Sequence, residues 1–252
     1  MKRLLAAIRF LTIVPVPGVW GTAESDLAGS VPFFPLVGLL LGTVAAALAW
    51  GIVRVAPPMV VAAVVMVAMM SFSGCLHLDG LSDTADGFLS GRRRERILEI
   101  MKDSHVGPMG MIAVVCVLLL KFAALASLAS LDAANLWRVV LLMPLAGRAA
   151  ICLHLALLPC ARPSGLGAVF CQKRHPWAAL WALAVLMGVA YLLLQTRGLV
   201  LVAACLVVAL LLAVYVYRKI GGATGDTFGA VCEIVEIVPA LALTLSPLHL
   251  LR

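Results

Sequence analysis

The sequence predicts an all-α polytopic integral membrane helical bundle, and its composition and its long apolar segments support that prediction. Of the 252 residues, 63% are hydrophobic and only 12% are charged, and the mean hydropathy is +1.11. Soluble domains are nearer half apolar and a quarter charged. We therefore expect residues 1–252 to form a single membrane-embedded domain, with lipid as the solvent for most of its surface.

Seven segments have the length, about 20 residues, and the apolar character of a membrane-spanning helix. The expected spans are Val31–Val53, Pro58–Leu76, Gly110–Ser130, Trp137–Leu158, Trp177–Gln195, Gly198–Tyr217 and Phe228–Leu248. The stretch Leu4–Val19 is apolar but short, and it contains Arg9 and two prolines. We expect this stretch to be an interfacial or re-entrant segment that precedes the first span.

Lysine and arginine gather in alternate loops. The loops after the second, fourth and sixth spans contain Arg92, Arg93, Arg94, Arg96, Lys102, Arg162, Lys173, Arg174, Arg218 and Lys219. The positive-inside rule then places the N-terminus and these loops in the cytoplasm. The net charge of +7 is spread over short loops, and aromatic residues make up only 6% of the chain, so we expect no nucleic-acid partner.

Three aspartates follow the second apolar run directly. Asp79, Asp83 and Asp86 are spaced i, i+4, i+7, so on a helix they fall within about 60° of one another. Like charges on one face repel, and a divalent cation would relieve that repulsion. Oxygen ligands favour Mg²⁺ or Mn²⁺. The alternative is an acidic, solvated first turn of a helix.

The rest of this loop is basic and then mixed in charge. Arg92 begins a run of arginines that could hold a substrate phosphate, or could equally anchor the loop to anionic lipid headgroups. Apolar residues at helical spacing within 97–101 indicate a short surface helix. Asp103 and His105 close the loop and could act as ligand or base, although such a pair is often ordinary surface.

Two further loops combine basic residues with glycine. In the loop after the fourth span, Gly165 and Gly167 would let backbone N–H groups approach an anion, although a plain turn also needs glycine. The glycine-rich loop 221–225 precedes the last span, in which Asp226 and Glu233 share one helical face. Acidic residues inside an apolar segment are usually functional. The alternative is ion pairing with Arg148 or Lys121.

Carboxylates from two separate helices, on one side of the membrane and beside basic and glycine-rich loops, indicate phosphoryl chemistry. One metal ion or a pair could bind a diphosphate and stabilise the leaving oxygen. An aspartate that is not fully engaged by metal could serve as the base for an attacking alcohol. We therefore expect Asp79, Asp83, Asp86, Asp226 and Glu233 to form one metal-binding catalytic site.

The chain resembles the cobalamin (5′-phosphate) synthase family along nearly its whole length. The most specific match is the run H-L-D-G-L-S-D-T-A-D-G at residues 77–87. Further matches follow in the same order at 95–104, at 161–167 (A-R-P-S-G-L-G) and at 221–226 (G-G-A-T-G-D), with Glu233 and Glu236 after them. Ser82 stands where alanine is common in the family.

The resemblance implies an enzyme of corrinoid biosynthesis in the bacterial inner membrane. Such an enzyme joins adenosylcobinamide-GDP to α-ribazole, or to its 5′-phosphate, releases GMP and requires Mg²⁺. The matching stretches add His77, Arg162, Gly222 and Thr224 to the expected substrate-binding residues. Membrane lipid is an expected partner, and a homo-oligomer is an open possibility.

Three other classes of protein share some of these features. The aspartate run is similar to that of membrane CDP-alcohol phosphotransferases, but Asp86 stands where their pattern has arginine. A prenyltransferase would need a second tight aspartate cluster, which Asp226 and Glu233 supply only in part. A cation or metabolite transporter would place its polar groups near the middle of the bilayer. The expected clustering of carboxylates at one membrane surface favours an enzyme.

Overall fold

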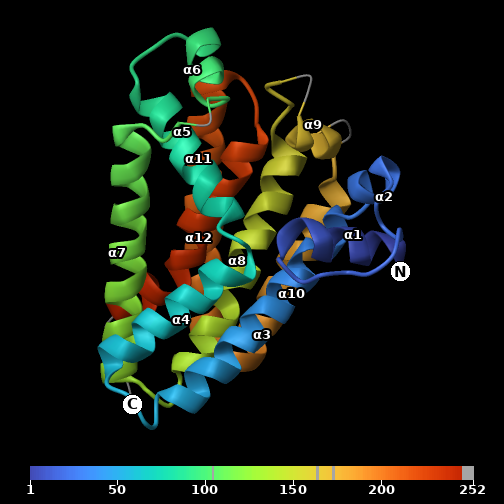
Figure 1. Cartoon of the computed structure of the whole chain (residues 1–252). Coiled ribbons are helices and arrows are strands. Elements are labelled where there is room, and N and C mark those ends of the chain that lie inside the picture. The colour runs from blue at the N-terminus through green and yellow to red at the C-terminus, as the bar shows by residue number, and fades with distance from the viewer. Residues whose placement is uncertain (104, 163–164, 172–173, 246–252) are drawn as a thin grey trace.

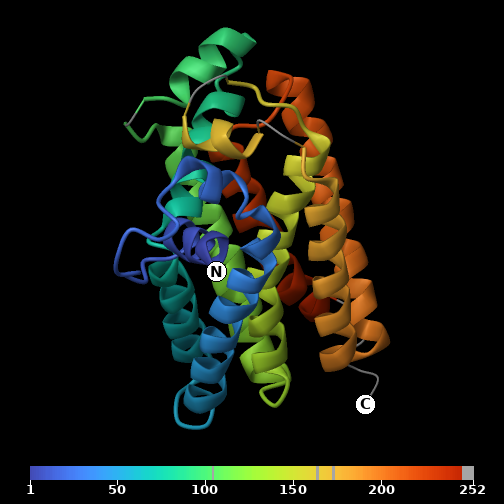
Figure 2. The same cartoon turned by 90° about the vertical axis from the view of Figure 1, so that its right-hand side faces the viewer.

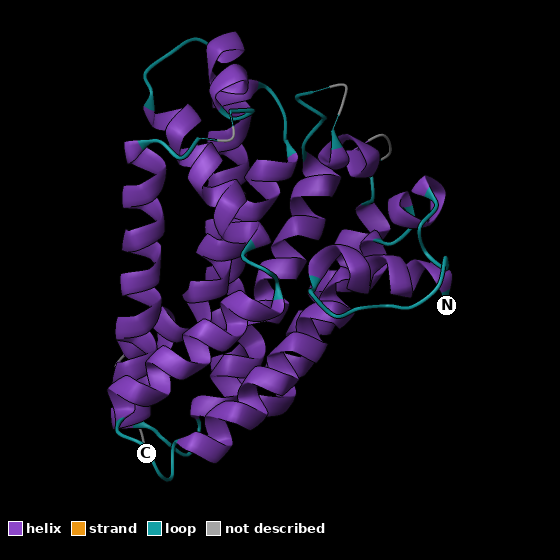
Figure 3. Cartoon of the chain, viewed as in Figure 1, coloured by secondary structure: helices purple, strands orange, loops and turns teal. Residues whose placement is uncertain are grey.

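The computed structural model describes residues 1–103, 105–162, 165–171 and 174–245. These residues form helices and no strand, apart from one isolated bridge between Cys160 and Ala223 (Figure 3). The helices are α1 (Lys2–Leu11), α2 (Glu24–Ala28), the 3-10 helix η1 (Val31–Phe33), α3 (Phe34–Ile52), α4 (Pro58–Phe72), α5 (Leu76–Leu89), α6 (Arg94–Ile100), α7 (Pro108–Leu131), α8 (Leu136–Leu157), α9 (Leu166–Cys171), α10 (Pro176–Leu194), α11 (Thr196–Ile220) and α12 (Gly225–Leu245).

Within the described ranges, six helices are long and apolar enough to cross a membrane, and this confirms the predicted polytopic bundle. They are α3 with its η1 turn, α7, α8, α10, α11 and α12. Helix α8 is the most enclosed of them, because α3, α10, α11 and α12 all pack against it. The other spanning helices keep more apolar surface facing outward, as lipid contact requires.

The second expected span, Pro58–Leu76, is broken near its end, a feature that the sequence did not predict. Helix α4 ends at Phe72, and α5 begins at Leu76 after a bend of 88°. The backbone adopts positive φ at Gly74 (+57°) and at Cys75 (+59°), a conformation that ends a right-handed helix. The aspartate motif therefore lies on the second arm of a broken span, drawn in teal in Figure 1.

The N-terminal segment does not span the bundle, as expected. Helix α1 has ten residues, too few to cross a bilayer, and it lies across the flank of the bundle (Figure 2). Its buried residues Ala6, Ala7 and Leu11 face the core near the beginning of α3. The chain then extends past the end of α4, where Ile13 N donates to the Phe72 carbonyl at 3.0 Å.

The polar connections meet at one end of the molecule. Helix α6, helix α9 and the turn between α11 and α12 all lie at the upper end in Figure 1. Hydrogen bonds join them: Arg94 Nε donates to the Ile220 carbonyl at 2.7 Å, and Ala161 N donates to the Ala223 carbonyl at 2.8 Å. The predicted gathering of motif loops on one face is confirmed, and their cytoplasmic location stays a prediction.

Candidate active site

A pocket of about 310 Å³ opens where these loops meet the spanning helices. Its walls come from α1, α3, α5, α8, α9, α12 and the loops beside α9 and α12. Seven of the residues expected from the sequence line it: His77, Asp79, Arg162, Gly165, Gly167, Thr224 and Asp226. Segments far apart in the sequence thus form one site. Its polar residues include the carboxylates of Asp79 and Asp226 and the guanidinium of Arg162.

Glycines bring the aspartate helix α5 against α12. A Cβ built on Gly80 would lie 2.7 Å from the Asp226 carbonyl oxygen, and one built on Gly229 would lie 2.9 Å from the His77 carbonyl oxygen. Only glycine permits backbones to pack this closely. The contact sets Asp79 beside Asp226 on the pocket wall, although the two residues are far apart in the sequence.

Arg162 connects three parts of the site. Its Nη1 donates to Asp226 Oδ2 at 3.0 Å, and its Nη2 donates to the Leu98 carbonyl in α6 at 2.9 Å. The Thr224 hydroxyl also donates to Asp226 Oδ2, at 3.3 Å. The guanidinium and the Asp226 carboxylate are only partly exposed, at 15% and 24% of their side chains. Asp226 therefore has a fixed orientation and a balanced charge.

Asp79 and Asp83 differ from Asp226 because their carboxylates have no hydrogen-bond or ion-pair partner among the described residues. Asp79 lines the pocket, and Asp83 lies one helical turn further along α5. The charges acting on Asp83 include those of Asp79, Asp226 and Asp86. The predicted repulsion is therefore present, and two of the carboxylates are free to bind a cation.

Asp86 faces a different partner. Its Oδ2 accepts the Gly107 N–H at 2.7 Å, and its Oδ1 accepts the Gly110 N–H at 2.8 Å. Gly107 and Gly110 lie at the N-terminus of α7, where backbone N–H groups have no partner within the helix. Asp86 therefore caps α7 from the neighbouring helix, and the structure does not place it in a shared metal site.

The arrangement fits Mg²⁺ with fewer protein ligands than the sequence suggested. Across the described ranges, no group of three or more His, Cys, Asp or Glu side chains is close enough to hold a metal ion. Mg²⁺ is commonly bound by one or two carboxylates, with water and substrate phosphates completing its octahedron. Of the five expected ligands, Asp79 and Asp83 are the two whose carboxylates have no partner in the described part of the chain, so they match that donor set.

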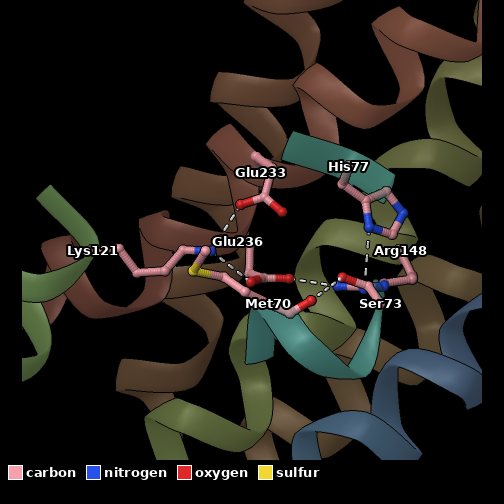
Figure 4. Close-up of polar contacts among 7 residues, drawn as sticks. All are labelled: Met70, Ser73, His77, Lys121, Arg148, Glu233 and Glu236. Atoms are coloured by element: carbon pink, nitrogen blue, oxygen red, sulfur yellow. Dashed lines mark hydrogen bonds and ion pairs between the residues drawn. The ribbon is translucent and has the colours of Figure 1, made fainter. Parts of the chain in front are cut away.

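Glu233 does not join the aspartates, contrary to the expectation from its helical face. Lys121 Nζ lies 2.9 Å from Glu233 and 2.8 Å from Glu236, and Arg148 donates to Glu236 (Figure 4). All four side chains are buried, with two positive and two negative charges that balance. The structure therefore matches the alternative interpretation, an ion-pair network that joins α7, α8 and α12.

His77 touches both the network and the pocket. Arg148 Nη2 lies 3.4 Å from His77 Nδ1, and the His77 side chain also lines the pocket (Figure 4). A guanidinium can only donate, so Nδ1 accepts and the ring hydrogen is on Nε2. The imidazole is therefore neutral and has one remaining donor.

The glycine loops pack against each other. A Cβ on Gly167 would lie 2.4 Å from Gly225 N, and one on Gly222 would lie 2.4 Å from the Pro159 carbonyl oxygen. Gly222 therefore serves loop packing rather than the pocket wall, whereas Gly167 does both. Gly165, with φ of +106°, is exposed at the pocket.

Besides Gly222, three more of the expected substrate-binding residues do not line the pocket. Arg92 is exposed at the loop that leads into α6. Asp103 and His105 pair with each other on the surface, with His105 Nδ1 2.6 Å from Asp103 Oδ1. The hydrogen bond from the His105 side chain lowers the pKa of Asp103 below its ordinary value. These features match the surface interpretation of the loop.

Sequence reasoning missed several residues that shape the site. Arg94 and Lys219 were counted only as topological charges, yet Arg94 binds two carbonyls, and Lys219 Nζ donates to the Phe88 carbonyl at 2.8 Å. For Lys219 the available signal was its place in the last turn of α11, because cations at a helix C-terminus bind free carbonyls. Arg94 is the first residue of α6 and had no such signal. The pocket phenylalanines Phe10, Phe34, Phe170 and Phe228 had no signal, since apolar residues are common throughout this chain.

The fold defines an integral membrane helical bundle with a polar-walled pocket where its motif loops meet at one end. More particularly, the chain belongs to the cobalamin-5-phosphate synthase family, whose profile matches residues 3–244.

Several relatives match nearly end to end. A protein of Roseiflexus sp. named adenosylcobinamide-GDP ribazoletransferase is 42% identical over 247 residues, which cover 97% of this chain and 90% of that protein. A protein of the same name from Pseudomonas putida is 40% identical over 248 residues, covering 97% and 99% of the two chains. No solved structure matches the chain significantly.

Proposed function

We propose that this protein is the transferase that joins adenosylcobinamide-GDP to α-ribazole, or to α-ribazole 5′-phosphate, with release of GMP. The observation that carries the proposal is the pocket, in which the Asp79 carboxylate lies with the ion pair of Arg162 and Asp226 at the meeting point of the family motifs. The names of the relatives agree with this substrate pair.

The release of GMP fixes which bonds change. The new bond joins a ribose hydroxyl oxygen of α-ribazole to the phosphorus that stays on the cobinamide. The bond that breaks joins this phosphorus to the bridging oxygen, which leaves with GMP. The hydroxyl proton goes to a base, and negative charge develops on the leaving phosphate. The protein therefore needs a cation, a donor for the diphosphate and a carboxylate base.

Asp79 and Asp83 would hold Mg²⁺. When bound, the ion would supply positive charge that neutralises the charge developing on the leaving group. Arg162, which lines the same pocket, offers the planar donors that suit a phosphate. Asp226, oriented by Arg162 and Thr224, is our candidate for the group that accepts the hydroxyl proton.

The reaction would take place on the cytoplasmic side of the bacterial inner membrane. The support is the lysine and arginine excess in the loops at the pocket end of the bundle. Single cysteines at positions 90 and 173, in a background without the native cysteines, should resist an impermeant thiol reagent in intact cells. Labelling of either position from outside would overturn the orientation.

The function is tested with the purified protein in detergent, supplied with adenosylcobinamide-GDP, α-ribazole and Mg²⁺. We expect GMP and the cobalamin product to form in equal amounts, and both to disappear when a chelator removes the metal. GMP release that does not need α-ribazole would indicate hydrolysis instead of transfer. The absence of both products from folded protein would reject the proposal.

A further inference from the structure

One side of the pocket is aromatic. The rings of Phe10 and Phe170 have centroids 4.8 Å apart, those of Phe34 and Phe170 are 5.5 Å apart, and those of Phe10 and Phe34 are 6.0 Å apart. These separations are typical of stacked and edge-to-face aromatic pairs. The three residues come from α1, the beginning of α3 and α9, and we call them the phenylalanine cluster.

The phenylalanine cluster is part of the same pocket as the charged residues. Phe34 and Phe170 are each only 1% exposed, whereas Phe10 is partly exposed. Of the three rings, that of Phe10 is therefore the most accessible. Ile151 and Leu155 of α8 extend this apolar wall.

Resting on the proposed function, we infer that the phenylalanine cluster binds the benzimidazole base of α-ribazole by stacking and apolar contact. A nucleoside in this pocket could place its base against the cluster while its ribose hydroxyls lie near Asp79 and Asp226, since all of these residues line one cavity. Phe10, from the short N-terminal helix, thus becomes a specificity-determining residue.

The alternatives fit this wall less well. A guanine base carries donors and acceptors on its edge that lose hydrogen bonds against phenylalanine, isoleucine and leucine, and such a loss is costly. Dimethylbenzimidazole has no such groups on its outer edge. The pocket volume of about 310 Å³ is near the lower limit of roughly 300–1,000 Å³ for small-molecule sites, which suits a base of two fused rings better than a corrin ring.

The test measures α-ribazole binding directly on purified protein in detergent, by calorimetry, without the second substrate. Phe10→Leu keeps an apolar side chain but removes the ring, so we expect the Kd for α-ribazole to rise roughly three- to tenfold. Phe10→Tyr keeps the ring and should bind within about twofold of the wild type. Phe122→Leu is the matched control, because Phe122 packs in a separate apolar cluster away from the pocket.

A second measurement needs no variant. The wild type should bind α-ribazole at least about tenfold more tightly than adenosine, whose base has a polar edge that the apolar wall leaves unpaired.

In turnover, Phe10→Leu should raise the KM for α-ribazole and leave the KM for adenosylcobinamide-GDP unchanged.

The outcomes separate this inference from the proposed function. Equal α-ribazole affinity in the wild type and folded Phe10→Leu, or equal affinity for α-ribazole and adenosine, would overturn the role of the cluster even if GMP is released normally. Tight binding that depends on Phe10, in a protein that releases no GMP, would support the cluster and reject the proposed reaction.

Discussion

Lys121 is the residue whose removal should damage the fold most clearly. Its ammonium lies 2.9 Å from Glu233 and 2.8 Å from Glu236, and its side chain is 1% exposed. Glu236 also has Arg148, whereas Lys121 is the ion-pair partner of Glu233 among the described residues. Lys121→Met keeps an apolar stem of similar length but leaves the Glu233 carboxylate uncompensated in a buried position.

Leaving one member of a buried ion pair without its partner typically costs about 3–5 kcal/mol. For a chain of this size, such a loss lowers the midpoint of thermal unfolding by roughly 6–20 °C. Tryptophan fluorescence of protein purified in detergent measures the midpoint as the temperature rises. The double variant Lys121→Met with Glu233→Gln removes the orphaned charge as well, so it should recover more than half of the loss.

Comparison of the two single variants, Lys121→Met and Glu233→Gln, with the double variant also decides the role of Glu233. Glu233→Gln alone should lower stability while GMP release per folded molecule stays near that of the wild type. Wild-type stability in Lys121→Met, or no recovery in the double variant, would refute the structural role of the network. A stable Glu233→Gln protein without turnover would show that Glu233 has a role in catalysis.

Three further variants test the parts of the site separately. Asp86→Ala removes the cap of α7 and should cost about 0.5–2 kcal/mol in thermal unfolding; a change in Mg²⁺ dependence at unchanged stability would instead make Asp86 a ligand. Gly229→Ala places a Cβ 2.9 Å from the His77 carbonyl oxygen and should lower both stability and turnover, whereas Gly188→Ala, with open space around its Cβ, should change neither. Asp103→Asn should leave GMP release within about twofold of the wild type, because that side chain lies on the surface and outside the pocket; a large loss would place it in the site.

Patterns along one segment predicted the fold well. Long apolar runs located the spanning helices, and helical spacing predicted correctly that Asp79 and Asp83 lie on one helix. The break at residues 73–75 was missed because Ser73 and Gly74 occur within an apolar stretch that composition treats as continuous. What broke the helix was local backbone conformation, and hydropathy does not report it.

The partners of the acidic residues could not be predicted in the same way. Helical spacing places Asp86 with the other aspartates and Glu233 with Asp226, but it does not say which neighbouring helix each side chain meets. Asp86 accepts hydrogen bonds from the N-terminus of α7, and Glu233 accepts one from Lys121. These pairings depend on how α5, α7 and α12 pack, which is long-range information that one sequence contains only implicitly.

The central claim is that Asp79 and Asp83 carry the metal-dependent transfer to α-ribazole, and Asp83→Asn tests it most directly. The substitution removes one of several repelling charges and no observed hydrogen bond among the described residues, so membrane expression and thermal stability should stay intact. GMP release at physiological Mg²⁺ should fall about a hundredfold or more. Turnover near that of the wild type under the same conditions would contradict the account.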